Sequence, residues 1–485
     1  MNDWFDYIMF HARAQPEKPA IVMEDRVVTY GMLRPAIERC AHRVVALNID
    51  PEGLVAVLVR NPIRHFTLSL GLFRAGVQAV SLEHSQADIK DLKFAAVLGD
   101  EDAVLLIDPS NLFIPVNDEW FSQDTLAMGE LPRGFLEHAQ VCRWSLTSGT
   151  TGRPKLVGHR VEDVGRRALK FVDLDWRLVL SLPGLSSNFG FTNGCAALAT
   201  GRTLCFAESP FQAIRMIELF SIDLLAVSTE QLVALTRVAR KLGALVGSLR
   251  AIYLAGSLPS RALLEAAMLY VCNNIHCRYS TSEIGQIAYA TADEVLLKPG
   301  LVGQITPGVE IGIFDRDGHR CPVGQIGIVK CRRNKDSVRR TPEQTTKVDH
   351  WVELGDLGWV AKDGQLYIAG RVTDAAATGP QINSDNPISP IYEVEHLLRL
   401  EWDSTDAAAI LINDSHDGAN PQIWIGVVDN KEASVEKITA LIRPRGIEHT
   451  IKLFDLHIIP RSPSGKVNRE QLKAVMLGYR ILLSR

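Results

Sequence analysis

The chain has 485 residues, of which 46% are hydrophobic and 22% are charged. This composition is typical of a folded globular protein and excludes a disordered, collagen-like or coiled-coil chain. The 52 basic and 56 acidic residues give a net charge of −4, so no basic surplus favours nucleic acid as a partner.

Up to about residue 260, strand-like and helix-like segments alternate. Apolar runs with the length of buried strands occur at 54–60, 103–107, 177–182, 222–227 and 250–255. Helical stretches lie between such runs, and a helix near the start has Thr29 as its candidate N-cap and apolar residues at steps of three and four. This alternation predicts α/β layering with a parallel sheet.

The pattern changes after about residue 300. Short strand candidates follow one another at Val309–Phe314, Gln325–Cys331 and Gln365–Ile368. Asp-Gly pairs at 317–318 and 363–364 are typical of hairpin turns. We therefore expect an antiparallel part, forming a small barrel.

From about residue 371, helices and strands mix again. The strand candidates here are Ala407–Ile412, Ile423–Val428 and Leu453–Ile459, and the helix candidates are Val435–Ile442 and Glu470–Leu483. Between the antiparallel part and these elements, residues 375–390 are rich in Gly, Pro, Asn and Ser, which indicates a loop or linker.

Eight cysteines are present, without a CxxC pair or a zinc-ligand spacing. Most lie in apolar surroundings, so we expect small buried hydrophobic side chains. The N-terminus has no signal-peptide pattern, and no apolar run reaches membrane-spanning length. These features predict a cytoplasmic, reduced protein without a membrane span.

The strongest local signal is TSGTTGRPK at residues 147–155. Glycines let backbone N–H groups turn inward, and the hydroxyls and Lys155 add donors, so the loop suits a polyphosphate. It is not a Walker A loop, because Pro154 stands where the second glycine should precede the lysine. A flexible polar turn is the alternative interpretation of the loop alone.

Four further sites carry matching chemistry. The run Tyr279–Glu283 offers an aromatic ring to cover a base and a carboxylate to hold a magnesium ion. Asp356 follows a glycine and could accept hydrogen bonds from ribose hydroxyls, while Arg371 adds a permanent charge. Lys466 lies in a glycine-containing loop near the C-terminus. Taken singly, each of these charges is more often a solvated surface group.

The order and spacing of the motifs carry more weight than any one of them. Together they resemble the adenylate-forming (AMP-binding) superfamily of acyl- and aryl-CoA synthetases, peptide-synthetase adenylation domains and luciferases. The resemblance spans nearly the whole chain. Its elements are 147–155, similar to (T/S)SGTTGxPK; 255–259, similar to GGAPL; 279–283, similar to YGxTE; 353–356, similar to TGD; Gly370-Arg371; and 463–469, similar to PxxxxGKxxR.

The resemblance implies a reaction and its participants. The family activates a carboxylic acid with ATP and Mg²⁺ to give an acyl-adenylate and pyrophosphate, then transfers the acyl group to a thiol such as that of CoA. It also implies a fold: an α/β protein whose residues 1–370 form two α/β subdomains plus a small β-barrel. Residues 371–485 would form a small mobile α+β domain that carries the catalytic lysine and rotates after adenylation.

Site residues are likewise implied by the resemblance. The residues that would hold the β- and γ-phosphates are Thr147, Ser148, Gly149, Thr150, Thr151, Gly152 and Lys155. Those that would frame adenine and hold ribose are Gly256, Ser257, Tyr279, Asp356 and Arg371. Ser282 would contact the α-phosphate, Glu283 would bind Mg²⁺, and Lys466 would bridge the α-phosphate and the substrate carboxylate.

Two segments depart from the family pattern. Where the amino-acid-activating branch has an aspartate for the substrate ammonium group, this chain has Asn188, so an amino-acid substrate is disfavoured. In the hinge, Thr373 stands at the pivot, Ala375–Ala377 removes the usual lysine, and the stretch up to 390 is longer than usual. The adenylation step is therefore better supported than the thioester step.

Three hypotheses remain. The first is an acyl- or aryl-CoA ligase acting on a small carboxylic acid. The second is a stand-alone adenylation enzyme that loads the phosphopantetheine arm of an acyl carrier protein. The third, from another class, is a degenerate nucleotide-binding sensor or scaffold. The sequence leaves the identity of the acid open.

Overall fold

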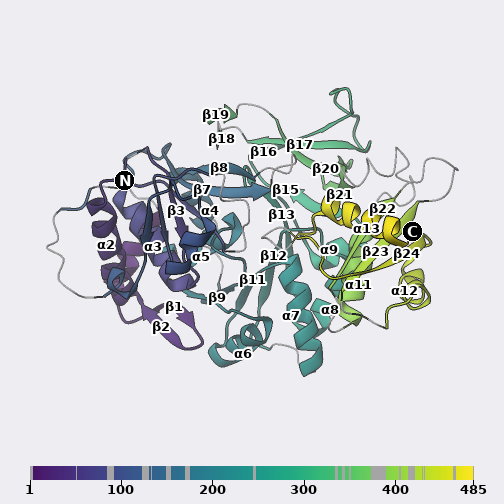
Figure 1. Ribbon diagram of the computed structural model, residues 1–485, viewed down its shortest axis with the longest axis horizontal. Helices are drawn as coiled ribbons and strands as arrows, with labels where there is room; N and C mark the ends of the chain where they lie inside the picture. The colour runs from purple at the N-terminus through teal and green to yellow at the C-terminus, as the bar shows by residue number, and fades with distance from the viewer. Residues whose placement is uncertain are drawn as a thin grey trace. The chain divides into compact units, whose positions relative to one another are not determined.

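The fold is taken from a computed structural model of the chain. The residues that it describes are 4–50, 52–84, 92–122, 130–132, 134–148, 154–169, 175–243, 247–333, 337–340, 345–348, 351–372, 389–402, 406–412, 421–428, 430, 432–461 and 466–483. The chain forms two compact units (Figure 1). The N-terminal unit comprises Met1–Ala226 and Lys335–Asp349, and the C-terminal unit comprises Val227–Asn334 and His350–Arg485.

The N-terminal unit alternates helices and strands as the apolar runs predict. Its helices are α1 (Trp4–Ala14), α2 (Tyr30–Ala46), α3 (Pro62–Ala75), α4 (Val161–Ala168), α5 (Asn188–Ala199) and α6 (Pro210–Phe220). Its strands are β1 (Pro19–Met23), β2 (Arg26–Thr29), β3 (Val55–Leu58), β4 (Ala79–Ser81), β5 (Ala96–Gly99), β6 (Phe113–Pro115), β7 (Val141–Ser148), β8 (Pro154–Arg160), β9 (Leu178–Ser181), β10 (Thr203–Cys205), β11 (Leu224–Ser228), β18 (Ser337–Arg340) and β19 (Thr345–Val348).

These strands lie in two sheets. One has the order β19-β18-β8-β7-β4-β3-β5-β6 and is parallel from β7 to β6. The other runs β2-β1-β10-β9-β11 and is parallel from β1 onward. Helices α2 and α3 lie side by side (Figure 1), and their apolar faces meet β3 in one core that includes Cys40, Val57 and Leu68.

The C-terminal unit contains the antiparallel part and the end of the chain. Its helices are α7 (Thr229–Leu242), α8 (Arg261–Tyr270), α9 (Ala292–Leu297), α11 (Ile391–Glu401), α12 (Val435–Ile442) and α13 (Arg469–Leu483). Its strands are β12 (Ala251–Ala255), β13 (Ile275–Thr281), β14 (Gly285–Thr291), β15 (Leu301–Ile305), β16 (Val309–Phe314), β17 (Gly327–Arg333), β20 (Val352–Val360), β21 (Leu366–Arg371), β22 (Asp406–Ile412), β23 (Gln422–Val428) and β24 (Thr450–Leu456).

In this unit the larger sheet has the order β12-β13-β14-β15-β21-β20-β17-β16 and is antiparallel from β13 onward. A separate three-stranded sheet has the order β22-β23-β24. Helices α7, α8 and α11 lie together (Figure 1), and Ala262 of α8 shares a core with Ile391 and Val394 of α11. Helix α11 is thus packed on α7 and α8.

The sequence expectation of an α/β fold with a smaller α+β part at its end is confirmed. Thr29 caps α2, since its side chain accepts a hydrogen bond from the Met32 backbone. The apolar run 103–107 was expected to be a strand, and this is wrong: Glu101–Leu106 forms a 3₁₀ helix. Leu105 is 76% exposed, so the run is not the buried strand that its composition indicates.

All eight cysteines are free, and all except Cys321 are buried. Burial raises the pKa of several of these thiols, to about 12 for Cys40, Cys205 and Cys277. They pack as small hydrophobic side chains, as expected. No helix within the described part of the chain is both long and apolar enough to cross a membrane.

Glu395 on α11 is 4% exposed and accepts hydrogen bonds from Arg469 Nη1 and from the Ala409 backbone, both at 2.7 Å. We expect Glu395→Ala to lower the free energy of unfolding by about 3 kcal/mol, because a buried arginine loses its carboxylate. Urea denaturation measures this loss. Glu401→Ala on the same helix removes only the exposed pair with Arg240 and should cost less than about 1 kcal/mol. Equal losses would contradict the prediction.

Candidate active site

Asp356 lies at the centre of a polar cluster in the C-terminal unit. It is on β20, and the strand register sets it opposite Arg371 of β21. The Tyr279 hydroxyl on β13 donates to Asp356 Oδ2 at 2.5 Å, and Arg371 Nε lies 3.2 Å from Oδ1. Burial and the Asp356 charge raise the pKa of Tyr279, so its hydroxyl stays a donor. Three strands thus fix one carboxylate that is only 7% exposed.

Lys466 joins this cluster from near the end of the chain. Its neighbour Val467 forms a backbone bridge with Arg461. Burial and, to a smaller extent, the Arg371 charge lower the pKa of Lys466, Asp356 and Glu230 act in the opposite direction, and the result is a pKa of about 8. The lysine therefore stays mainly cationic at neutral pH, but with a weakened hold on its proton.

Gly256 and Ser257 follow β12. Gly256 has φ +120°, a region that side-chain-bearing residues rarely adopt. The Ser257 carbonyl accepts a hydrogen bond from Thr229 Oγ1 at 2.7 Å, which fixes the backbone. Ser257 Oγ is buried and has no hydrogen-bond partner among the residues that the structure describes. Because such a group is costly to leave unpaired, it suits a ligand with a polar edge, such as a nucleotide base.

Ser282 and Glu283 lie in the turn that follows β13. Thr281 Oγ1 accepts a hydrogen bond from the Ile284 backbone at 3.3 Å, which closes this turn. The turn is continuous with the strand that carries Tyr279. A hydroxyl and a carboxylate therefore stand at the strand end, within the same unit as Asp356 and Lys466.

The TSGTTGRPK segment belongs to the N-terminal unit. Its first and last residues form a hairpin of β7 and β8, in which Thr147 pairs with Lys155 and Ser148 with Pro154. Gly149, Thr150, Thr151 and Gly152 lie outside the described residues. The phosphate-binding role of this hairpin stays a prediction, as do the roles of the other site residues.

A buried arginine anchors the segment before α5. Helix α5 begins at Asn188, one of the positions that differ from the family pattern. Arg143 on β7 is 3% exposed, and its guanidinium lies over the Phe191 ring at 3.7 Å. It donates to Ser81 Oγ at 2.9 Å and to the Leu185 carbonyl at 2.5 Å. Burial lowers its pKa to about 10, so it remains charged. No local sequence pattern indicates that Arg143 is buried.

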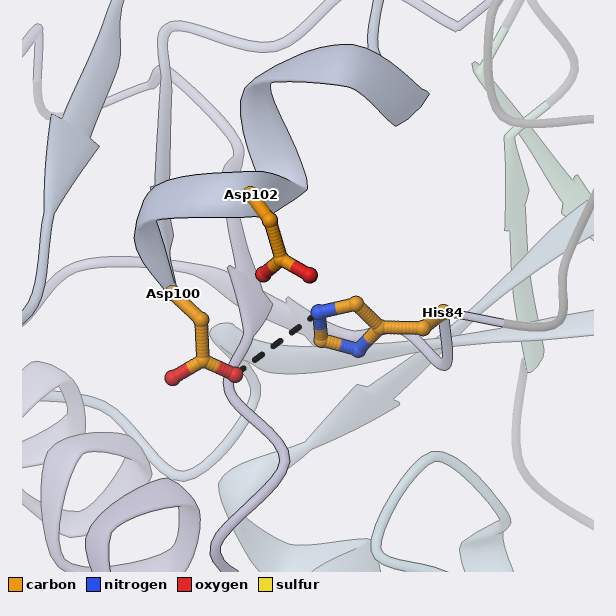
Figure 2. Close-up of side chains that lie close together, drawn as sticks. All are labelled: His84, Asp100 and Asp102. Carbon is orange, nitrogen blue, oxygen red and sulfur yellow. Dashed lines mark ion pairs between the residues drawn. The ribbon is translucent and has the colours of Figure 1, made fainter.

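A second group of ionisable side chains lies where β3, β4 and β5 end. Figure 2 shows His84 pointing toward Asp100 and Asp102. His84 Nε2 lies 3.7 Å from Asp100 Oδ2, and Arg60 holds both oxygens of Asp102, at 2.8 and 2.6 Å. The Arg60 backbone also donates to Asp100 at 2.7 Å. Because Arg60 already offsets these carboxylates, we assign no metal to the cluster.

The structure therefore brings together Tyr279, Asp356, Arg371 and Lys466, four residues that the sequence analysis selected. It also brings in Glu230, which the sequence analysis missed. Ser228 and Gln231 form a capping box that marks the start of α7, but this pattern says nothing of the partners of Glu230, which lies between them. The hinge residues 373–388 lie outside the described part of the chain.

Comparisons with known proteins identify similar enzymes. The chain is 25% identical to the fatty acid–acyl-carrier-protein ligase ScoC of Streptomyces coeruleorubidus, over 96% of this chain and 94% of that protein. It is also 25% identical to the 2-succinylbenzoate–CoA ligase of Bacillus subtilis (strain 168), over 98% of each. The fold matches O-succinylbenzoate coenzyme A synthetase (MenE) from Bacillus subtilis in complex with ATP and magnesium ion, with a TM-score of 0.74, 22% identity and coverage of 96% and 99%.

The family model that describes AMP-binding enzymes matches residues 10–335, which is more than half of the chain. The resemblance seen in the order of the motifs is thus confirmed, and the chain belongs to the AMP-binding enzyme family.

Proposed function

We propose that the chain is an AMP-forming acid–thiol ligase. In the first step an oxygen of a small carboxylic acid would attack the α-phosphorus of ATP, the bond to the β-phosphate oxygen would break, and pyrophosphate would leave. In the second step a thiol would lose its proton, attack the acyl carbon and release AMP. The observation that carries the proposal is the cluster of Tyr279, Asp356, Arg371 and Lys466 in a member of this family.

The first step has to overcome the repulsion between two anions, the carboxylate and the α-phosphate. A cation placed between them offsets the charge that develops during attack, and Lys466 would supply it. Asp356 would accept hydrogen bonds from ribose hydroxyls. The buried Ser257 hydroxyl and the Tyr279 ring would meet the base, and Ser282 would contact the α-phosphate.

The remaining phosphates would need donors and a metal ion. Glu283 would hold Mg²⁺, an ion that prefers oxygen ligands and offsets phosphate charge when it is bound. The hairpin that ends in Lys155 would hold the β- and γ-phosphates through backbone N–H groups and its lysine. ATP and Mg²⁺ are supported by the relative whose structure contains both.

Two acceptors are supported for the second step. CoA is favoured by the relative named as a CoA ligase, and the phosphopantetheine arm of a carrier protein by the relative named as an acyl-carrier-protein ligase. We place CoA first. The chain is equally identical to both relatives, so the choice of acceptor is a matter for experiment.

Lys466→Ala should lower acid-dependent exchange of pyrophosphate into ATP by on the order of 100-fold, because a preorganised charge is removed from the reacting centre. The assay first screens aryl, fatty and amino acids with the unchanged enzyme. Lys473→Ala on α13 removes an exposed lysine close by in sequence and should leave the rate unchanged. Full activity of Lys466→Ala would refute its role, and no exchange with any acid would refute the ligase.

The rate of exchange should also report the pKa of Lys466. The lysine is active as a cation, so kcat/KM should be constant below pH 7 and fall as pH rises through about 8. The residual activity of Lys466→Ala should lack this decrease, because the titrating amine is gone. A decrease that persists in Lys466→Ala would assign it to another group.

The acceptor can be identified by following thioester formation with free CoA and with a phosphopantetheine-loaded carrier protein at equal concentration. We expect CoA to give the faster reaction. Mass spectrometry distinguishes the two products. Thioester on the carrier protein alone would replace the CoA-ligase proposal with the stand-alone adenylation enzyme.

A further inference from the structure

Four charged side chains link α7 to the segment that carries Lys466. We call them the Glu230 network: Glu230, Arg399, Arg461 and Asp406. Glu230 Oε2 binds Arg399 Nη1 and lies 3.3 Å from Arg461 Nη1. Arg461 in turn holds both oxygens of Asp406, at 3.0 and 2.6 Å. One carboxylate on α7 therefore gathers two arginines from the last third of the chain.

We propose that Glu230 is a positioning residue for Lys466. It would fix Arg461 and, through the backbone bridge, Val467, so that the adjoining Lys466 stays beside Asp356 and Arg371. The inference rests on the proposed function, because it assigns Glu230 a part in the adenylation step that Lys466 serves.

Two backbone contacts explain how a contact at Arg461 reaches Lys466. Arg461 forms a backbone bridge with Val467, the residue next to Lys466. The Asn468 backbone N–H also donates to the Pro460 carbonyl at 2.8 Å. The backbone at 460–461 is therefore tied to the backbone at 467–468. Holding the Arg461 side chain against α7 thus also holds Val467 and the adjoining Lys466.

The burial of the network makes the contact costly to lose. The side chains of Glu230, Arg399 and Arg461 are 16%, 12% and 19% exposed. Glu230 lies in the first turn of α7, where the helix dipole favours a negative charge. Without it, the two arginines would lose the carboxylate that they share, and their largely buried positive charge would be less well compensated. Arg461 would then lose its ion pair with α7.

Other contacts link the last third of the chain to α8 without involving Arg461. Arg445 pairs with Glu265 of α8 at 2.7 Å, and Glu393 accepts a hydrogen bond from the Ala262 backbone at 3.2 Å. The packing of the segment on α8 therefore does not depend on Glu230. Glu265→Gln removes the ion pair with Arg445 and loses the same charge as Glu230→Gln. It is therefore the matched control.

The first experiment compares exchange of pyrophosphate into ATP in Glu230→Gln and Glu265→Gln. We expect kcat of Glu230→Gln to fall by about 10- to 100-fold, as for a misplaced catalytic group, and KM for ATP to change by less than about threefold. Glu265→Gln should resemble the unchanged enzyme. Glu230→Asp, which keeps the charge at shorter reach, should recover part of the rate. Equal behaviour of the two glutamine variants would overturn the proposal.

The second experiment needs no catalysis, so it separates this proposal from the proposed function. Competitive acetylation with acetic anhydride, followed by mass spectrometry, measures the apparent pKa of Lys466 in the ligand-free protein. The charged groups that face Lys466 are Arg371, Asp356 and Glu230, and Tyr279 is bonded to Asp356. The unchanged protein and Glu265→Gln should give about 8.

The direction of change in Glu230→Gln decides its role. If Glu230 only supplies charge, its loss lowers the pKa of Lys466 below about 8. If Glu230 holds Arg461 and Val467 in place, its loss lets Lys466 enter water, and the pKa of Lys466 rises toward about 10.4, the value of a free lysine. We expect the rise. A fall or no change would overturn the proposal, whether or not the protein activates any acid.

Discussion

The charge balance around Asp356 constrains the rest of the C-terminal unit. Arg371 and Lys466 are two cations beside one carboxylate, and Glu230 is the next anion in reach of the lysine. Burial and then the Arg371 charge weaken the lysine's hold on its proton, while Asp356 and Glu230 act in the opposite direction. Two neighbouring cations suit a bound phosphate. The surrounding elements accordingly have to keep like charges close together, which costs free energy until an anion arrives.

Strand pairing offsets part of the free energy that this arrangement of charges costs. Asp356 and Arg371 face each other because β20 and β21 are antiparallel neighbours, so their contact follows from backbone register. Tyr279 comes from β13 in the same sheet and satisfies the second carboxylate oxygen. Lys466 lies outside the named strands. Its placement depends on the backbone bridge between Val467 and Arg461 and on the ion pair of Arg461 with Glu230, which is why a single carboxylate on a neighbouring helix gains importance.

The parts of the molecule that the sequence predicts are those with a local cause. The alternation of apolar runs predicts the strands, and the motif order selects Tyr279, Asp356, Arg371 and Lys466. The Glu230 contacts have no such signal, because their partners stand 169 and 231 residues away along the chain. Arg143 was missed for a related reason, since a charged residue in a strand does not indicate burial. The run 103–107 shows the converse: apolar residues alone do not make a buried strand, because Leu105 faces water.

The buried cysteines have a consequence for a chain that makes an acyl-adenylate. Such a mixed anhydride reacts with any thiolate that it meets, and a thiolate of the enzyme itself would divert the acyl group into a dead-end protein thioester. Burial keeps Cys195 and Cys277 protonated, and even the half-buried Cys321 has a raised pKa. The protein thus offers its intermediate few competing nucleophiles of its own. The packing of small apolar side chains thereby protects the chemical yield of the reaction.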